Sequence, residues 1–453
     1  MWREIKMKKI KFSVIFLIIS VLVSFLNAKV YNFKLKNGLQ VYLIKKSTLP
    51  IVSINVIYRT GCKDEYNGIT GIAHMLEHMN FRGSKHFKDG YYEKFVMTHG
   101  GVENASTSFD YTRYYTIINK KYLSQILKIY ADNMRFLTID RKKFLKERNV
   151  VYQERLWRID NSPDGYLYYT LHRLAYLESP YRWTPIGFSS DILSWTRNDV
   201  YNFYKKHYAP NNAAIVICGD INLNYVHKII LKYFGKIRPV KIKKKFTKEP
   251  EQKGERRATL NFVSSTKKLA IAFHIPHLDE KSTPALDIIT YLLFARENSI
   301  LNKILVRQKK LCSSIYGGNQ ERVYSGLYVI FATLNKNAKF KKVEKIIWNE
   351  IDKLKKGEIS DKDFNLSKKR AIFDYLYSKE TISGYASAVS FYAGLDKVNY
   401  YLNYEKLIQK VTKKDIVYWA NKVFKKNNST VINLVPVKGK SIEYKPPISG
   451  NLR

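Results

Sequence analysis

The sequence predicts an α+β fold built from two similar units of roughly 200 residues each. First, strand-like alternation, helical runs and an apolar closing strand follow one another in the same order twice along the chain. Second, residues 236–257 are rich in Lys and Glu and contain two Pro residues, a composition typical of a linker between domains. Third, the chain of 453 residues is too long for one hydrophobic core.

The N-terminal segment, residues 1–28, is predicted to be a secretory signal peptide. An apolar run at 12–26 follows a basic stretch and ends shortly before Ala28, after which cleavage is expected. The mature chain would then be secreted across the inner membrane into the periplasm. The alternative is an uncleaved membrane anchor, although about 15 apolar residues are few for a span. Met7 is an alternative start. The basic residues are Arg3, Lys6, Lys8, Lys9 and Lys11.

In the first unit, strands are predicted where apolar residues alternate, and Asn37-Gly38 between the first two indicates a hairpin. These strands are residues 30–35, 39–45, 51–58, 103–108, 112–118 and 213–218. Helices are predicted from about residue 71, at 91–99, across 121–177 with a break at 161–165, at 197–208 and after 220.

The second unit repeats this order. Its predicted strands are residues 260–264, 269–275, 313–316, 326–334 and 430–435. Its predicted helices are 284–295, 300–309 and most of 340–424. The expected domains are therefore 29–235 and 259–453, joined by a linker at 236–258.

Composition excludes two classes of protein. The Cys residues at 62, 218 and 312 are odd in number and widely spaced, so neither a disulfide framework nor a thiolate metal site is expected. The formal net charge of +41 could attract nucleic acid. However, the Lys residues are spread along the whole chain without any nucleic-acid-binding motif, so we predict no nucleic-acid partner.

The sequence His74-x-x-Glu77-His78 has the spacing of a metal site. Two His residues four positions apart share one face of a helix, and Glu77 lies at the edge of that face. A catalytic zinc needs a third protein ligand and an open position for a water, which a non-ligating Glu can deprotonate. A surface helix with two stray His residues is the alternative. Most of the neighbouring residues are apolar, however, which would make burial of three polar side chains costly without a ligand.

The helix predicted at about 141–158 offers candidates for the third ligand, Glu147 and Glu154. Seven residues apart, they lie on nearly the same face of a helix. Several Arg residues surround them, so a simple salt-bridged helix face explains the same spacing. Spacing alone leaves both possibilities open.

Taken together, the motifs of this chain resemble those of the pitrilysin or insulinase-type metallopeptidases. The resemblance includes the catalytic subunits of bacterial two-subunit members and of the mitochondrial processing peptidase, and covers nearly the whole mature chain. It implies one half of a clamshell-like peptidase chamber. The matching segments are residues 61–65, 71–79, 100–107, 110–112, 150–154, 179–181, 210–212 and 219–220.

This resemblance implies a role for each candidate residue. His74, His78 and Glu154 would bind one Zn²⁺, with Glu77 as the general base that activates water. Glu147 would orient one ligand through a hydrogen bond. The implied function is a zinc-dependent endopeptidase acting on peptides or short unfolded segments, and the alternative is a non-catalytic peptide-binding or scaffold subunit. An extended peptide would add to the edge strand at 103–108, at Asn104 and Ala105.

One position departs from the family pattern. Family members whose second half completes the site carry an Arg followed seven positions later by a Tyr. Here Arg307 is followed by Ser314, or by Ser313 with a shift of one residue, and Tyr316 is out of register. We therefore expect a heterodimer with a homologous subunit that lacks the zinc motif but supplies the Arg and Tyr. A homodimer is the alternative.

Overall fold

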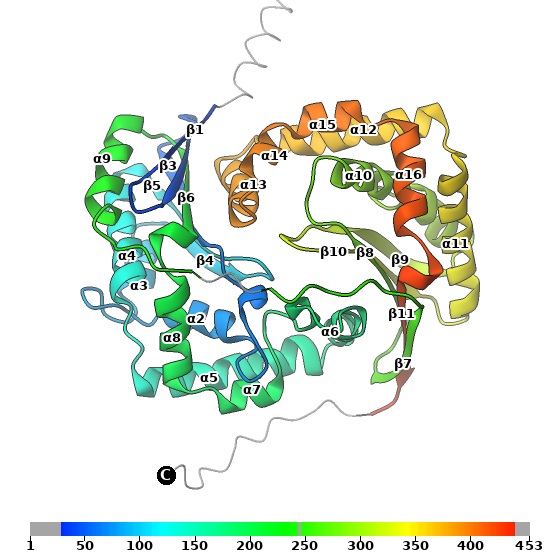
Figure 1. Cartoon of the computed structure of the whole chain (residues 1–453), viewed down its shortest axis with the longest axis horizontal. Helices are drawn as coiled ribbons and strands as arrows, with labels where there is room; N and C mark the ends of the chain where they lie inside the picture. Colours follow the sequence, from blue (N-terminus) through cyan, green and yellow to red (C-terminus); the bar gives the residue numbers. More distant parts are fainter. Residues whose placement is uncertain (1–28, 243–245, 440–453) are drawn as a thin grey trace, which may run out of the picture.

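A computed structural model describes residues 29–242 and 246–439, which form two β-sheets flanked by helices (Figure 1). The predicted signal peptide lies outside the described residues. The first sheet contains β1 (Val30–Lys34), β2 (Gln40–Lys45), β3 (Ile51–Tyr58), β4 (Val102–Thr107), β5 (Thr112–Asn119) and β6 (Ala213–Gly219). The second contains β7 (Arg256–Val263), β8 (Lys267–Ile275), β9 (Cys312–Gln320), β10 (Gly326–Leu334) and β11 (Ser429–Val437).

The two sheets have the same topology. Five strands of the first sheet lie in the order β2-β6-β3-β5-β4, and the second sheet has the order β7-β11-β8-β10-β9. Among these five strands of each sheet, the pair β2-β6 or β7-β11 is parallel and the other pairs are antiparallel. The prediction of two copies of one α+β unit is therefore confirmed. Strand β1 extends only the first sheet, through the predicted hairpin with β2.

The helices cover these sheets and join their strands. Those of the first unit are α2 (Ile72–Asn80), α3 (Tyr91–Thr98), α4 (Leu123–Phe136), α5 (Arg141–Arg155), α6 (Pro163–Ala175), α7 (Ser189–Ser194), α8 (Arg197–His207) and α9 (Leu223–Phe234). Those of the second are α10 (Ser282–Leu293), α11 (Phe340–Lys356), α12 (Asp361–Tyr377), α13 (Ile382–Gly394), α14 (Val398–Leu402), α15 (Tyr404–Lys410) and α16 (Lys413–Val423). The described residues also include the π-helical segments η3 (Leu156–Asp160) and η6 (Asn302–Gln308).

Four elements differ from their sequence predictions. The helical stretch predicted at 121–177 has a further break at 137–140, between α4 and α5. Strand β7 begins at Arg256, inside the predicted linker, because it pairs in parallel with β11 over its whole length. Strand β9 continues to Gln320 through Gly317 and Gly318, which interrupt the apolar alternation. Helix α7 was not predicted, since its six residues span less than two turns.

The two units exchange one helix each. Helix α6 packs on the second sheet, where its apolar residues join a buried cluster with β8, β10 and β11. Helix α13 packs on the corresponding strands of the first sheet, β3 and β6. Figure 1 shows both helices in the middle of the molecule, between the sheets. Each sheet is therefore covered on one face by a helix of the other unit.

The segment between the units is held against the molecule. Glu249 accepts hydrogen bonds from the backbone amides of Leu177, Glu178 and Ser179, at 2.9 to 3.0 Å. The Phe246 ring stacks on Tyr324, with 3.4 Å between the ring centroids. At Phe246 and Glu249, the described part of this segment is therefore fixed to the rest of the molecule.

The exchange of helices predicts that the two units unfold together. Val389 on α13 is fully buried against the first sheet. We expect Val389→Asp to lower the free energy of unfolding by about 3 kcal/mol or more, because it buries an unpaired charge. Chemical denaturation should show one transition at a lower midpoint. Ser383→Asp, on the exposed face of the same helix, is the control. Two separate transitions, with only the second unit destabilised, would contradict this coupling.

Candidate metal centre

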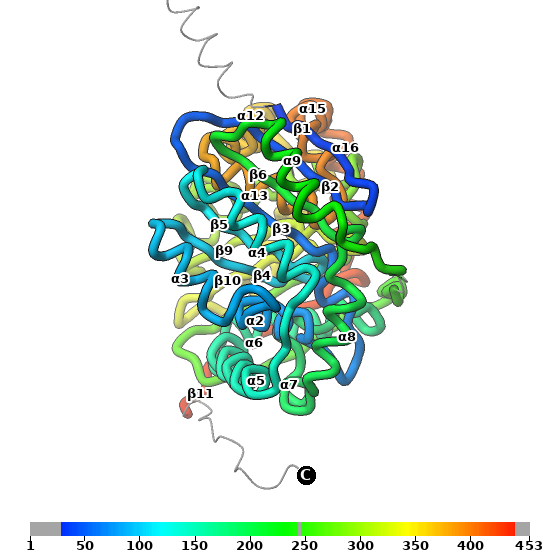
Figure 2. Tube along the Cα trace, turned by 90° about the vertical axis from the view of Figure 1, so that its left-hand side faces the viewer, coloured from blue at the N-terminus to red at the C-terminus, as the bar shows by residue number. Residues whose placement is uncertain are grey.

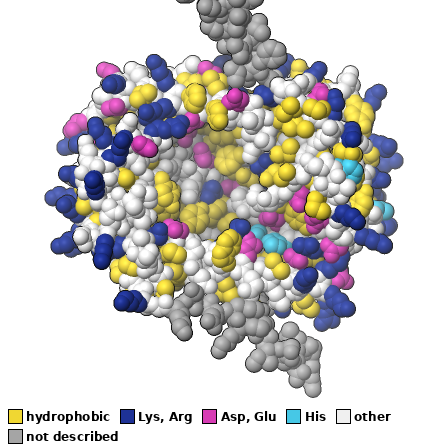
Figure 3. Space-filling model, turned by 180° about the vertical axis from the view of Figure 1, so that it is seen from behind, with side chains coloured by type: hydrophobic (Ala, Val, Ile, Leu, Met, Phe, Trp, Pro, Cys, Tyr) yellow, Lys and Arg dark blue, Asp and Glu magenta, His cyan; other side chains and the backbone are white. Residues whose placement is uncertain are grey.

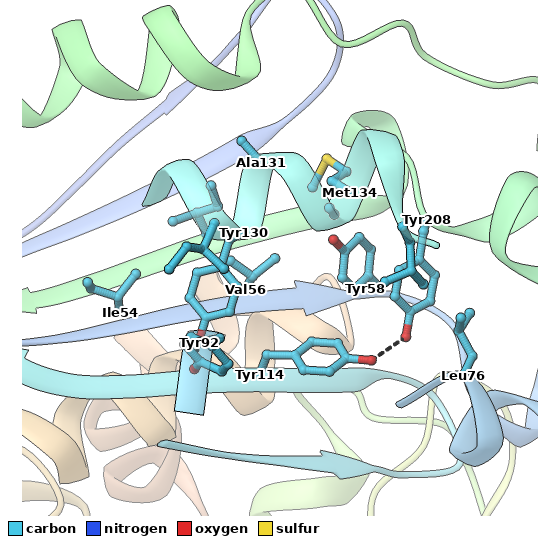
Figure 4. Packing of buried hydrophobic residues seen from close by; sticks show 14 of the residues in the cluster. Ile54, Val56, Tyr58, Leu76, Tyr92, Tyr114, Tyr130, Ala131, Met134 and Tyr208 are labelled. Atoms are coloured by element: carbon cyan, nitrogen blue, oxygen red, sulfur yellow. Dashed lines mark hydrogen bonds between the residues drawn. The ribbon is translucent and has the colours of Figure 1, made fainter. Parts of the chain in front are cut away.

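Helix α2, which carries the two His residues, is fixed by its own hydrophobic face. Leu76 packs into the core of the first unit, beside Tyr58, Tyr114 and Tyr208 (Figure 4). The hydroxyl groups of Tyr114 and Tyr208 are hydrogen-bonded at 2.8 Å, and the Tyr58 ring stacks on Tyr208 with centroids 3.8 Å apart. One face of α2 is thus held by the core, and its polar residues face a cavity.

A buried carboxylate caps the start of this helix. Glu65, 5% exposed, accepts hydrogen bonds from the amides of Gly71 at 2.8 Å and Ala73 at 3.0 Å. The indole of Trp183 donates to the same carboxylate at 2.9 Å. The amides in the first turn of a helix lack partners within the helix, so the Glu65 oxygens satisfy buried donors, although burial raises the pKa of Glu65 to about 8. Glu65 therefore sets where α2 begins, and with it the position of the His residues.

We expect Glu65→Gln to lower the free energy of unfolding by about 1 to 3 kcal/mol, because an amide nitrogen cannot replace an acceptor oxygen facing buried donors. Denaturant unfolding of the purified protein measures this loss. Glu350→Gln, at an ion pair on α11 in the second unit, is the control and should change stability by less than about 1 kcal/mol. Equal effects for the two variants would show that Glu65 does not cap the helix.

The structure brings His74, His78 and Glu154 together. The Nε2 atoms of the two His residues lie 3.6 and 3.4 Å from Oε2 of Glu154. In a tetrahedral zinc site with bonds of about 2.1 Å, ligand atoms lie about 3.4 Å apart, so this donor set fits Zn²⁺. Figures 1 and 2 both place α5, which carries Glu154, beside α2. In the described ranges, no other group of three His, Cys, Asp or Glu side chains has a metal-site arrangement.

Two further groups orient the candidate ligands. Oε2 of Glu147 lies 3.3 Å from Nδ1 of His78, which turns Nε2 of that ring towards the ligand cluster. The other oxygen of Glu147 lies 2.9 Å from Nε of Arg82. Arg158 Nε lies 3.0 Å from Oε1 of Glu154, leaving Oε2 for the cluster. Sequence reasoning assigned a role to Glu147 but not to Arg82.

At neutral pH, Glu154 and His74 are in the forms that bind a metal, whereas His78 is protonated. Burial raises the pKa of Glu154, but the His78 hydrogen bond and the nearby His74 and Arg158 outweigh it and lower that pKa to about 2. Burial and the neighbouring His78 lower the pKa of His74 to about 3. Burial lowers the pKa of His78, yet hydrogen bonds to Glu147 and Glu154 raise it to about 9. A metal that binds here therefore displaces a proton from His78.

Glu77 stands apart from the three candidate ligands. Its Oε2 accepts a hydrogen bond of 2.5 Å from the Thr107 hydroxyl at the end of β4, and the residue is 9% exposed. Burial raises the pKa of Glu77 to about 7, although the Thr107 hydrogen bond opposes the shift. A carboxylate with a pKa close to neutral suits general acid and base catalysis. Thr107 was missed as a site residue, although it ends the 100–107 motif.

A cavity of about 840 Å³ opens on this cluster. One wall is formed by Asn104 and Ala105 of β4, which is an edge strand as predicted. The Ala105 amide donates to the Asn104 side chain at 2.8 Å, which indicates that this amide points away from β5 and towards the open edge. Trp157, 71% exposed, forms part of another wall. Figure 3 shows a face of the molecule that is hollowed at its centre.

Arg307 and Tyr316, which were compared with the Arg and Tyr of other family members, lie outside the metal-centre cavity. Arg307, on η6, donates to the side chain of Asn298 at 2.8 Å. Tyr316, on β9, is 55% exposed and stacks on Phe331. Among the described residues that line the metal-centre cavity, neither Arg307 nor Tyr316 is present.

In the described part of the chain, no helix is both long and apolar enough to cross a membrane.

These features define a two-domain α+β protein in which His-x-x-Glu-His meets a third carboxylate beside an open edge strand. Comparison with known families agrees. The family model for insulinase, peptidase family M16, matches residues 40–183, and the model for the peptidase M16 inactive domain matches residues 194–371. The chain belongs to peptidase family M16, the insulinase family, as its motifs predicted.

Relatives of known name support this assignment. The chain is 35% identical over 407 residues to the zinc protease PqqE of Helicobacter pylori, covering 89% of this chain and 92% of that protein. A probable mitochondrial-processing peptidase subunit beta of Arabidopsis thaliana is 28% identical over 203 residues, covering 45% of this chain and 38% of that protein. The crystal structure of a protease from Helicobacter pylori matches with a TM-score of 0.87 and 34% identity, covering 90% of this chain and all of that one.

Proposed function

We propose that this M16 peptidase is a zinc-dependent endopeptidase. The observation that carries the proposal is the convergence of His74, His78 and Glu154, with Glu77 beside them in one cavity. The expected cofactor is one Zn²⁺ per chain. When bound, zinc would polarise a scissile carbonyl and the attacking water.

The chain's own residues then carry out the proton transfers. Glu77 accepts a proton from the attacking water, since it is not one of the candidate ligands and its pKa of about 7 allows it to be ionised near neutral pH. It returns that proton to the leaving amine as the peptide bond breaks. Thr107 keeps the Glu77 carboxylate aligned during this exchange.

The expected substrate is an extended peptide or a short unfolded segment. Strand β4 has an open edge, and a substrate strand could pair with it at Asn104 and Ala105. The cavity lies between such a strand and the metal ligands, so the scissile bond of a peptide paired with β4 would lie over the cluster. A folded protein could not present its backbone in this way.

Removal of the metal tests this function. Treating the purified protein with a chelator should abolish cleavage of an unstructured peptide, and added Zn²⁺ should restore it. Activity that survives complete removal of zinc, confirmed by elemental analysis, would contradict the proposal. Zinc binding and peptide binding without any cleavage, with partner present, would favour the non-catalytic alternative.

We further propose that the chain is the catalytic half of a heterodimer, because Ser314 stands where a Tyr would complete the site. We expect the isolated chain to cleave peptide at least about tenfold more slowly than the chain mixed with a homologous subunit that lacks the zinc motif. Capture of the tagged chain from its native cells, followed by mass spectrometry and peptide assay, identifies that subunit. Full activity of the chain as a monomer or homodimer would disprove this assignment.

The proposed location is the periplasm, reached through the signal peptide at residues 1–28. The proposed first domain keeps its predicted limits, 29–235, but the second is proposed to begin at Arg256 rather than at 259, because β7 begins there. N-terminal sequencing of the protein from its own cells tests the cleavage: a start at Lys29 supports it, and retention of the apolar segment indicates a membrane anchor.

A further inference from the structure

The turn between β4 and β5, residues 108–111, lies where the two units meet. Strand β4 leads into this turn and carries both the proposed peptide-binding edge and Thr107, whose hydroxyl donates a hydrogen bond to Glu77. A displacement of the turn therefore moves the edge strand relative to the base. What holds the turn consequently decides how peptide and Glu77 are aligned.

The β9–β10 turn of the second unit holds this turn from one side. Asp110 is 2% exposed, and its Oδ2 accepts a hydrogen bond from the amide of Val323 at 3.4 Å. Its other oxygen accepts one from the Tyr181 hydroxyl of the first unit at 2.5 Å. The Arg322 guanidinium lies 4.3 Å from the centroid of the Phe109 ring. One buried carboxylate thus joins the hairpin to both units.

Helix α13, also of the second unit, holds the hairpin from another side. The Tyr111 ring lies directly against Gly394, where an added Cβ atom would come within 2.5 Å of Tyr111 Cγ. On β5, Arg113 donates to the Ser387 hydroxyl at 2.8 Å. Contacts from two separate elements of the second unit therefore fix one short turn of the first.

We infer that Asp110 is a positioning residue, through which the second unit holds the β4–β5 hairpin in line with Glu77. This inference rests on the proposed peptidase function. It gives a part in the reaction to the second unit, whose residues up to 371 lie within the match to the inactive-domain model. Among the described residues, Asp110, Val323 and Gly394 are neither candidate ligands nor part of the lining of the metal-centre cavity.

Asp110→Asn and Gly394→Ala test the inference by two different routes. The first removes a charge that accepts two hydrogen bonds, and the second wedges a methyl group against Tyr111. We expect both variants to bind zinc as the wild type does. For both we expect a higher KM for an unstructured peptide and a lower kcat, with kcat/KM reduced about tenfold or more, because small misplacements at a reacting centre are costly.

Matched controls are available in the same interface. Asp164→Asn breaks a contact of 2.9 Å with Lys268, between α6 and the second sheet, away from the hairpin. Ser383→Ala changes an exposed position on α13. Both controls should keep kcat/KM within about twofold of the wild type, since Asp164 and Ser383 are exposed and lie away from the hairpin. All assays use the full chain together with its partner subunit.

A merely structural role for Asp110 gives a different result. In that case the activity of Asp110→Asn would fall in proportion to the folded fraction, with KM unchanged, and the inference would be overturned. Hydrogen exchange of the β4 amides in peptide-free protein gives a readout independent of catalysis. We expect these amides to exchange at least about tenfold faster in both test variants than in the controls. Unchanged exchange would overturn the inference even if the wild type cleaved no peptide.

Discussion

Replacing Glu77 with Gln is expected to abolish peptide cleavage while leaving zinc bound. Gln keeps the shape of the side chain and can still accept the Thr107 hydrogen bond, but it cannot take a proton from water. We expect kcat to fall by about 10²- to 10⁴-fold, the usual contribution of a general base. Elemental analysis should give the same zinc content as the wild type. Glu77 Oε2 accepts a hydrogen bond from Thr107, and Glu77 does not belong to the group of candidate ligands.

Glu350→Gln is a suitable control for general effects of replacing a carboxylate, since Glu350 lies on α11 of the second unit and pairs with Lys353. It should retain wild-type kcat. If Glu77→Gln cleaved peptide at the wild-type rate with zinc bound, another group would have to be the base. If it lost zinc as well as activity, Glu77 would be a ligand instead.

Glu154→Gln is expected to lose zinc and activity together, whereas Glu147→Gln should lose affinity only. Both residues lie on one face of α5, but Glu154 Oε2 approaches both imidazoles, while Glu147 contacts the far nitrogen of His78. Loss of a residue that orients a ligand typically costs 10- to 100-fold in metal affinity. Glu147→Gln should therefore regain activity at high zinc concentration, and Glu154→Gln should not.

Competition with a chromophoric chelator measures the zinc affinity of both variants, and peptide cleavage at rising zinc concentration measures the recovery. Recovery of Glu154→Gln at zinc concentrations that also saturate Glu147→Gln would contradict the assignment of the third ligand. Equal affinities of the two variants would contradict it as well, because the structure gives the two carboxylates different positions.

The sequence predicts those parts of the metal centre whose residues are close together along the chain. His74, Glu77 and His78 lie within five positions, so helix geometry alone places them together. Glu154 could not be assigned from its spacing, since its contact with the His residues depends on the packing of α5 against α2. Only the resemblance to the metallopeptidases selected it, and the structure places it beside both His residues.

The residues that sequence reasoning missed act through contacts between distant elements. Arg82, in the loop after α2, reaches Glu147 on α5, and Thr107 reaches Glu77 from the edge strand. Neither contact leaves a periodic pattern in the sequence. The fold was predicted to the level of two similar units, but the exchange of α6 and α13 was not. An apolar helix face indicates burial without indicating which sheet it covers.

The central claim, that His74, His78 and Glu154 hold zinc beneath a peptide paired with β4, has one direct test. Crystals of the Glu77→Gln variant, grown with zinc, an unstructured peptide and the partner subunit, allow anomalous diffraction at the zinc absorption edge. We expect a single strong anomalous peak in this chain, at a zinc ion bound by both Nε2 atoms and by the Glu154 carboxylate, with the peptide backbone paired at Asn104 and Ala105. A peak at other residues, or a peptide bound away from β4, would contradict it.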